Sequence, residues 1–157
     1  MKLSDCMKRD VVSIPVSANV TRAVALFTER HIGMLPVVDD TGRLVGILTL
    51  RNLLGLVMPD FVRLMDDFDF VHDFGAVEAA QPSPEAMARS VREVMQPPNS
   101  VAEDCGLLRA FALLRQYALQ DLPVTAPDNR LVGVASRVDV GIALLASWRM
   151  PLQKGTP

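Results

Sequence analysis

The sequence predicts a mixed α/β fold, of the α+β kind, in which two copies of a strand–helix–strand–strand–helix unit pack about a pseudo-twofold axis. Three observations predict it: an internal repeat, matching helical and strand-like periodicity in both copies, and turn residues between the paired strands. The chain has 157 residues, 50% of them hydrophobic and 22% charged. This length suits one compact domain or two very small ones.

The repeat relates the first third of the chain to its last third. Pro36 and Pro123 lie 87 positions apart, as do Gly46 and Gly133, and the letters Arg-Leu-Val-Gly end at both glycines. A unit of about 50 residues buries its own core poorly, so we expect the two copies to pack face to face.

Copy one is expected to begin with a short strand at residues 11–14, ended by Pro15. Asn19 or Ser17 then caps a helix. The apolar positions of this helix are spaced i, i+3, i+4 and i+7, and they are Val20, Ala23, Val24 and Phe27. Two strands at 35–38 and 44–48 follow, joined by the turn at 39–42, and a helix starts near Leu50.

Copy two repeats this order. Its first helix carries an apolar stripe of Leu107, Ala110, Phe111 and Leu114. The turn between its strands is expected at 126–129, and its last helix from about Arg137 to Trp148. We therefore predict four parts: repeat one at 1–58, an insert at 59–90, repeat two at 91–150 and a C-terminal tail at 151–157.

The insert differs in composition from both copies. It holds seven acidic and two basic residues and four of the six phenylalanines. This many aromatic residues are unusual in a freely solvated linker. We therefore expect a short helix that starts at Pro59 or Asp60 and packs its Phe side chains. A disordered acidic tether is the alternative. Pro84-Glu85 fits the first turn of a helix leading into copy two.

Composition also excludes several classes of protein. The net charge is −2 and the isoelectric point about 5.6, which argues against a broad nucleic-acid surface. No apolar run approaches the roughly 20 residues of a membrane span, and the polar N-terminus is unlike a signal peptide. Two isolated cysteines predict neither a disulfide framework nor a metal site, and they fit the cytoplasm.

The repeats resemble a tandem pair of CBS domains, the cystathionine β-synthase-type motif, together called a Bateman module. The resemblance is carried by Gly-Met-Leu-Pro-Val-Val-Asp at 33–39, Arg-Leu-Val-Gly-Ile-Leu-Thr at 43–49, Leu-Pro-Val at 122–124 and Arg-Leu-Val-Gly-Val-Ala-Ser-Arg-Val-Asp at 130–139. It covers nearly the whole chain except the insert and the last few residues.

The resemblance implies a regulatory ligand-binding module with no catalytic residues, no catalytic cofactor and no metal. Its expected ligand is AMP, ADP, ATP or S-adenosylmethionine, bound between the copies. Its expected partners are a second copy of the chain, forming a homodimer, and an unknown regulated enzyme or transporter. A ligand-free dimerisation or docking scaffold that uses the acidic insert is the alternative.

The most informative motif is Ser136-Arg137-Val138-Asp139, where a strand ends and a helix begins. The first turn of a helix offers unpaired N–H groups to a phosphate, Ser136 adds a hydroxyl, and Asp139 can accept both ribose hydroxyls. Ser-x-x-Asp at a helix start is also a capping box, and both roles can hold together.

The resemblance places this motif against residues of the other copy. The expected ligand-binding set is Val11, Val12, Ile32, Gly33, Met34, Pro36, Ser136, Arg137 and Asp139, whose apolar members suit an adenine slot. A weaker second cleft would use Thr49, Asn52, Asn99, Ser100, Leu119 and Gln120. Asn52 replaces the acid there and lacks its charge, so we expect this cleft to be weak or empty.

Overall fold

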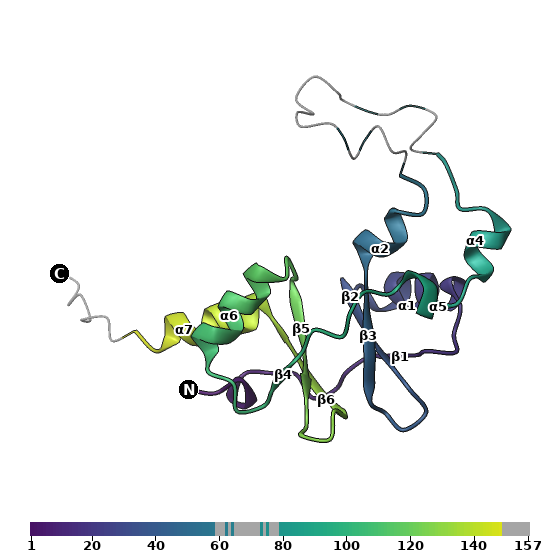
Figure 1. Cartoon of the computed structure of the whole chain (residues 1–157). Helices are drawn as coiled ribbons and strands as arrows, with labels where there is room; N and C mark the ends of the chain where they lie inside the picture. The colour runs from purple at the N-terminus through teal and green to yellow at the C-terminus, as the bar shows by residue number, and fades with distance from the viewer. Residues whose placement is uncertain (59–61, 63, 65–72, 74, 76–78, 149–157) are drawn as a thin grey trace. The chain divides into compact units, whose positions relative to one another are not determined.

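The computed structural model describes residues 1–58, 62, 64, 73, 75 and 79–148. The chain divides into two compact units: unit 1 comprises Met1–Val11 and Asn99–Pro157, and unit 2 comprises Val12–Pro98. Each unit contains one three-stranded sheet with helices beside it (Figure 1). The mixed α+β class predicted from the repeat is therefore confirmed, with one sheet for each copy.

Unit 2 contains copy one and the segment that leads into copy two. Its elements are β1 (Ile14–Pro15), α1 (Val20–Arg30), β2 (Met34–Val38), β3 (Leu44–Thr49), α2 (Leu50–Leu54), α4 (Pro84–Ala88) and α5 (Val91–Val94). The strand order is β1-β2-β3, with β1 parallel and β3 antiparallel to β2.

The expected first strand was placed three residues too early. Strand β1 is Ile14–Pro15, so Pro15 is its last residue. Proline is tolerated there because β1 is an edge strand, and the next donor to the ladder is the N–H of Val16, 2.8 Å from the carbonyl oxygen of Val38.

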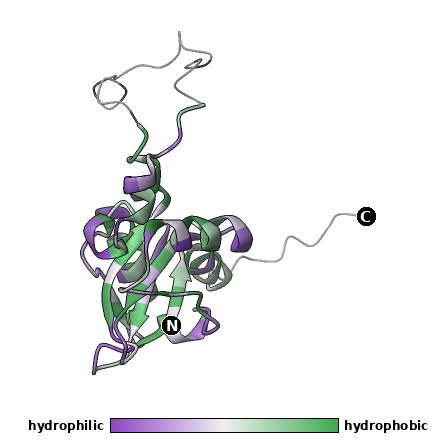
Figure 2. Cartoon of the chain, turned by 90° about the vertical axis from the view of Figure 1, so that its right-hand side faces the viewer, coloured by the Kyte–Doolittle hydropathy of each residue, from purple (hydrophilic) through white to green (hydrophobic). Residues whose placement is uncertain are grey.

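Helix α1 begins where the sequence indicates. The Asn19 side chain caps it by accepting a hydrogen bond of 3.0 Å from the N–H of Arg22. The buried core of unit 2 is then formed by Ile14, Val20, Ala23, Leu26, Phe27, Leu35, Val37, Leu48, Leu53 and Val91. In Figure 2 the strands are drawn largely in green, the colour of hydrophobic residues.

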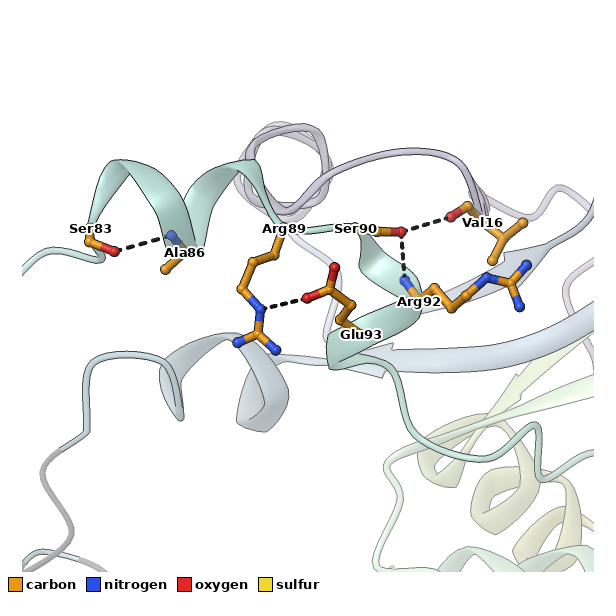
Figure 3. A network of polar contacts seen from close by, with 7 residues as sticks. All are labelled: Val16, Ser83, Ala86, Arg89, Ser90, Arg92 and Glu93. Carbon is orange, nitrogen blue, oxygen red and sulfur yellow. Dashed lines mark hydrogen bonds and ion pairs between the residues drawn. The ribbon is translucent and has the colours of Figure 1, made fainter.

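The segment before copy two packs on copy one. Helix α4 starts at Pro84 after the cap residue Ser83, as the sequence predicts. Ser90 then caps α5, and its hydroxyl also lies 3.4 Å from the carbonyl oxygen of Val16 (Figure 3). This places Val91 in the core of unit 2. The expected helix at Pro59 or Asp60 and its Phe residues fall outside the described residues.

Unit 1 contains copy two and the N-terminal segment. Its elements are η1 (Leu3–Asp5), β4 (Val101–Ala102), α6 (Leu107–Gln116), β5 (Asp121–Thr125), β6 (Leu131–Ser136) and α7 (Arg137–Ala146). The sheet order β4-β5-β6 repeats that of unit 2. The stripe expected on α6 is buried at Leu107, Ala110 and Leu114, but Phe111 is exposed, because it lies at the edge of that stripe.

Residues 1–11 fall within repeat one by the predicted boundaries, but they pack on the sheet of copy two. The N–H of Leu3 donates to the carbonyl oxygen of Cys105 over 2.9 Å, and Lys8 pairs with Val134 in an antiparallel bridge. The sequence repeat and the packing unit therefore divide the chain differently. No helix within the described ranges is long and apolar enough to cross a membrane.

Candidate functional site

The capping box of α7 forms the centre of the candidate site. Strand β6 ends at Ser136, whose extended backbone turns the chain into the helix. The Ser136 hydroxyl accepts a hydrogen bond of 2.9 Å from the N–H of Asp139 and donates one of 2.7 Å to Asp139 Oδ2. The two polar side chains of the predicted phosphate and ribose site are thus in contact at a helix start.

Lys8 joins this box from the N-terminal segment. Its Nζ lies 3.5 Å from Asp139 Oδ2, and the two side chains are 69% and 24% exposed. Its backbone N–H and C=O pair with Val134 over 2.8 and 2.9 Å, which fixes the base of the side chain. The hydrogen bonds and the ion pair all use Oδ2, so in the described part of the chain Asp139 Oδ1 takes no hydrogen bond.

The surroundings hold Asp139 ionised. Partial burial raises the pKa of Asp139, but the Ser136 hydroxyl, the Lys8 ammonium and the Ser136 N–H outweigh it, so the pKa lies below its ordinary value. Asp121, the register partner of Ser136 in the sheet, behaves in the opposite way. Burial raises the pKa of Asp121, and the nearby Asp139 charge adds to this while Lys8 opposes it.

Sequence reasoning missed Lys8 and Asp121. Both reach the site through long-range pairing, Lys8 from a segment more than a hundred residues away, and nothing local in the sequence marks either one. One signal was available: Met7, directly before Lys8, has its counterpart in Met95 before copy two. This match indicates that the segment preceding each copy is part of the repeated structure.

Unit 2 contains a neutral version of the same box. Thr49 donates hydrogen bonds from its N–H and hydroxyl to Asn52 Oδ1 over 2.8 and 2.9 Å. Gln96 occupies the place of Lys8, because it pairs with Ile47 as Lys8 pairs with Val134. Two amides therefore stand where unit 1 has a carboxylate and an ammonium.

The residues predicted for the adenine slot lie mostly in unit 2, near its own α2. Met34 and Pro36 are buried, Gly33 is exposed, and the carbonyl oxygen of Gly33 accepts a hydrogen bond of 3.3 Å from the N–H of Leu50. A shallow cavity of about 580 Å³ is lined by Phe27, Thr28, His31, Ile32, Gly33 and Leu50. Val12 packs at the edge of the core of unit 2, whereas Val11 belongs to unit 1.

Four residues predicted for the second cleft lie in unit 1 with the Ser136 box. Arg137 donates from its backbone N–H to the carbonyl oxygen of Gln120 over 2.7 Å and from Nη2 to that of Leu119 over 3.4 Å. Ser100 Oγ lies 3.4 Å from Thr125 Oγ1, and Asn99 precedes it. The structure thus brings Arg137 together with Leu119 and Gln120, while the pairing of Asp139 with residues of unit 2 stays a prediction.

A second cavity, of about 750 Å³, lies in unit 2 between α2 and the α4–α5 segment. It is lined by Arg51, Asn52, Leu54, Gly55, Leu56, Met58, Arg89, Glu93 and Val94. Arg89 Nε is 3.0 Å from Glu93 Oε2, and Figure 3 shows this pair on α4–α5. In the described part of the chain, no three His, Cys, Asp or Glu side chains could together hold a metal ion.

The repeated boxes match a known family. A family model described as "CBS domain" matches residues 3–59 and again 91–145. The chain belongs to the CBS-domain family. The tandem CBS pair predicted from the repeat is therefore confirmed, and such pairs are regulatory modules.

Two relatives extend over most of this CBS pair. The uncharacterized protein MJ1004 of Methanocaldococcus jannaschii is 27% identical over 154 residues, which is 98% of this chain and 61% of that protein. The CBS domain-containing protein CBSX2 of Arabidopsis thaliana is 29% identical over 137 residues, which is 82% of this chain and 56% of CBSX2. The chain thus spans about three fifths of the length of these relatives.

Solved structures of CBS pairs match in fold, and some contain ligands. The crystal structure of CBSX2 has a TM-score of 0.72 at 26% identity and covers 96% of this chain and 98% of that one. A second CBSX2 structure, in complex with AMP, has a TM-score of 0.68 at 27% identity and covers 92% and 96%. The CBS pair of protein MJ0100, in complex with 5′-methylthioadenosine and S-adenosyl-L-methionine, has a TM-score of 0.69 at 16% identity, covering 94% and 98%.

Proposed function

We propose that this CBS pair is a sensor of an adenosine ligand, either AMP, ADP, ATP or S-adenosylmethionine, and that it controls a partner protein without catalysing a reaction. The observation that carries the proposal is the Ser136–Asp139 box, with a carboxylate held ionised and one oxygen unused by the described residues. A carboxylate of this kind can accept hydrogen bonds from ribose hydroxyls. The complex of CBSX2 with AMP supports the choice of ligand.

Each element of the ligand has a proposed counterpart. Asp139 would hold the ribose, and Ser136 with the first N–H groups of α7 would face the phosphate. The adenine would lie against the apolar set Val11, Val12, Ile32, Gly33, Met34 and Pro36. The approach of this set to Asp139 belongs to the proposal, and so does the weaker role of the Asn52 cleft.

Ligand-dependent stabilisation tests the proposal. The thermal unfolding of the full chain would be followed with AMP, ADP, ATP, S-adenosylmethionine and GTP. A ligand at 100 times its dissociation constant stabilises by about 2.7 kcal/mol, which is readily measured. At least one adenosine ligand should raise the melting temperature while GTP leaves it unchanged; no shift with any adenosine ligand would contradict the proposal.

Control of a partner requires a surface that responds to the ligand, and we propose that this surface includes a homodimer interface. Helices α6 and α7 pack together in unit 1, and several of their large apolar side chains are exposed: Leu108, Phe111, Val138, Ile142, Leu145 and, just after α7, Trp148. So many exposed apolar side chains on two adjacent helices are characteristic of an interaction surface. A second copy of the chain is the proposed occupant, and the cytoplasm is the proposed location.

One observation favours the alternative function, a ligand-free docking scaffold. The cavity beside α2 is lined by two arginines and one glutamate; Arg89 pairs with Glu93, and Arg51 leaves the lining with a net positive charge. The acidic, Phe-containing insert begins directly after Met58, which lines this cavity. The insert is acidic and continues the chain from the edge of this cavity, so it is one candidate occupant. An acidic segment of a partner protein is the other.

Charge reversal separates the two occupants. If the insert docks in its own chain, Arg51→Glu should increase hydrogen exchange of the amides from Phe61 to Phe70. The matched control is Arg43→Glu, an exposed arginine in the hairpin of the same unit. Exchange at random-coil rates in the unmodified chain would mean that the insert is a tether and leave the cavity to a partner.

A further inference from the structure

We propose that Lys8 is a specificity-determining residue of the Asp139 site, which selects adenosine ligands with a 5′-phosphate over those with a cationic 5′ substituent such as the sulfonium of S-adenosylmethionine. The inference rests on the proposed function, because it takes Asp139 as the ribose ligand. It goes further by specifying the charge of the 5′ substituent and by assigning a role to a residue outside the Ser136–Asp139 and Thr49–Asn52 boxes.

The backbone of Lys8 is held in place by hydrogen bonds, whereas its side chain is mostly exposed. Its backbone pairs with Val134 on both sides, and its side chain is 69% exposed. The ammonium lies 3.5 Å from Asp139 Oδ2. It has three donors and, among the described residues, one carboxylate partner, so donors remain for an anionic ligand. A 5′-phosphate lies only a ribose ring and a methylene from the hydroxyls held by Asp139, within the sweep of a lysine side chain.

The charges around the capping box make the Lys8 ammonium the group that decides whether a phosphate or a sulfonium is favoured. Asp121 and Asp139 both contribute negative charge here: burial and then the Asp139 charge raise the pKa of Asp121, and the Lys8 ammonium acts to lower the pKa of both carboxyls. The other cation at the helix start, Arg137, is turned toward the backbone and donates from Nη2 to the carbonyl oxygen of Leu119. Without Lys8 an incoming phosphate would face two carboxylates, whereas a sulfonium would be attracted to them.

The neutral box of unit 2 supports the same assignment. There Asn52 replaces Asp139, Gln96 replaces Lys8, and Met34 stands opposite Thr49 where Asp121 stands opposite Ser136. The ammonium therefore occurs in the unit that has the carboxylates and is missing from the box that lacks them. The backbone bridge alone does not account for the lysine, because Gln96 makes the same bridge in unit 2 without a charge.

Calorimetric titration of the full chain with adenosine, AMP and S-adenosylmethionine tests the role of Lys8. Lys8→Gln should weaken AMP binding roughly 10- to 150-fold, the range expected for losing a hydrogen bond to a charged group. Adenosine affinity should stay the same, and S-adenosylmethionine should bind as well as before or more tightly. Lys8→Arg retains the positive charge, so this variant should keep the preference for AMP that Lys8→Gln loses.

Arg9→Gln is the matched control, because Arg9 lies on the same segment but pairs with Glu103 over 3.0 Å. Equal AMP affinity in the Lys8→Gln and Arg9→Gln variants, with AMP still bound by the unmodified chain, would overturn the role of Lys8 and leave the proposed function intact. If the unmodified chain binds none of the three ligands, this inference fails, and the proposed function fails as well if ADP and ATP do not bind either.

Discussion

The sulfur of Met7 lies against the backbone of Gly133, so closely that a Cβ at position 133 would sit 2.9 Å from Sδ and 3.0 Å from the carbonyl oxygen of Lys8. Met95 crosses Gly46 in the same way, and a Cβ at Gly46 would overlap the Met95 sulfur. Gly133 thus makes room for the segment at Met7, and Gly46 makes room for the segment at Met95. Gly133 therefore allows the close approach of the segment that carries Lys8.

Gly133→Ala should destabilise the protein. The added methyl group meets Met7 and the backbone of Lys8, and overpacking of this kind costs about 1–3 kcal/mol. Urea unfolding monitored by circular dichroism measures the loss. The matched control is Gly141→Ala within α7, where a Cβ meets nothing within 4 Å, so this variant should gain about 0.5–1 kcal/mol from helix propensity. Equal stability of the two variants would contradict the role given to Gly133.

Much of the fold could be predicted because its signals are local. The apolar spacing of α1, the Asn19 cap and the Pro84 start all lie within a few residues of the element they determine. The placement of β1 could not be predicted in this way, because only its parallel pairing with β2 shows that Pro15 sits at a sheet edge. Phe111 fits the stripe of α6 by spacing, and its exposure is a property of the packed unit.

The candidate site also contains some residues that local sequence predicts and others that only the folded structure brings together. Ser136 and Asp139 are three residues apart, so their contact follows from the start of one helix. Lys8 and Asp121 come to the site by strand pairing and are visible only in the folded unit. Sequence alone therefore indicates the ribose and phosphate groups but not the charge that surrounds them.

Asp121→Asn should stabilise the protein at neutral pH. Because burial raises the pKa of Asp121, its charged form is disfavoured in the folded state. The folded state then binds the proton more tightly than the unfolded state, so stability falls as the pH rises from the unfolded to the folded pKa of this carboxyl. Unfolding free energies of the variant and the unmodified chain should differ at pH 7 and converge below about pH 4. A difference of the same size at both pH values would mean that the charge of Asp121 is not its cause.

Ile142→Glu should dissociate the proposed homodimer. A charge on the exposed apolar face of α7 cannot be buried against a second copy without a partner, and removing it from water is costly. Sedimentation at micromolar concentration measures the change. Asp40→Lys, in the exposed hairpin turn of unit 2, is a control that should stay dimeric. A monomeric unmodified chain, with or without ligand, would refute the dimer itself.

The two boxes should contribute unequally to ligand binding. Asp139→Ala removes an ionised acceptor and should cost roughly 1.5–3 kcal/mol of the binding free energy for AMP. Asn52→Ala removes a neutral cap and should change the affinity little. Calorimetry of both variants compares the losses directly, and equal losses would show that the two boxes act alike.

Transplanting the charged pair should create a second site. In the double variant Asn52→Asp with Gln96→Lys, the new carboxylate can still accept from the N–H and hydroxyl of Thr49, as Asn52 Oδ1 does over 2.8 and 2.9 Å. The new lysine keeps the backbone pairing of Gln96 with Ile47, so both side chains should occupy the positions that Asp139 and Lys8 hold in unit 1.

Calorimetric stoichiometry should then show an additional AMP bound per chain, which neither single variant reaches. Met34 stands where unit 1 has Asp121, so the transplanted ammonium faces one carboxylate instead of two, and its attraction for a phosphate is opposed by less negative charge. A double variant with unchanged stoichiometry would mean that the box and its lysine are not enough, and that the remaining difference between the two sites lies in the residues that contact the adenine.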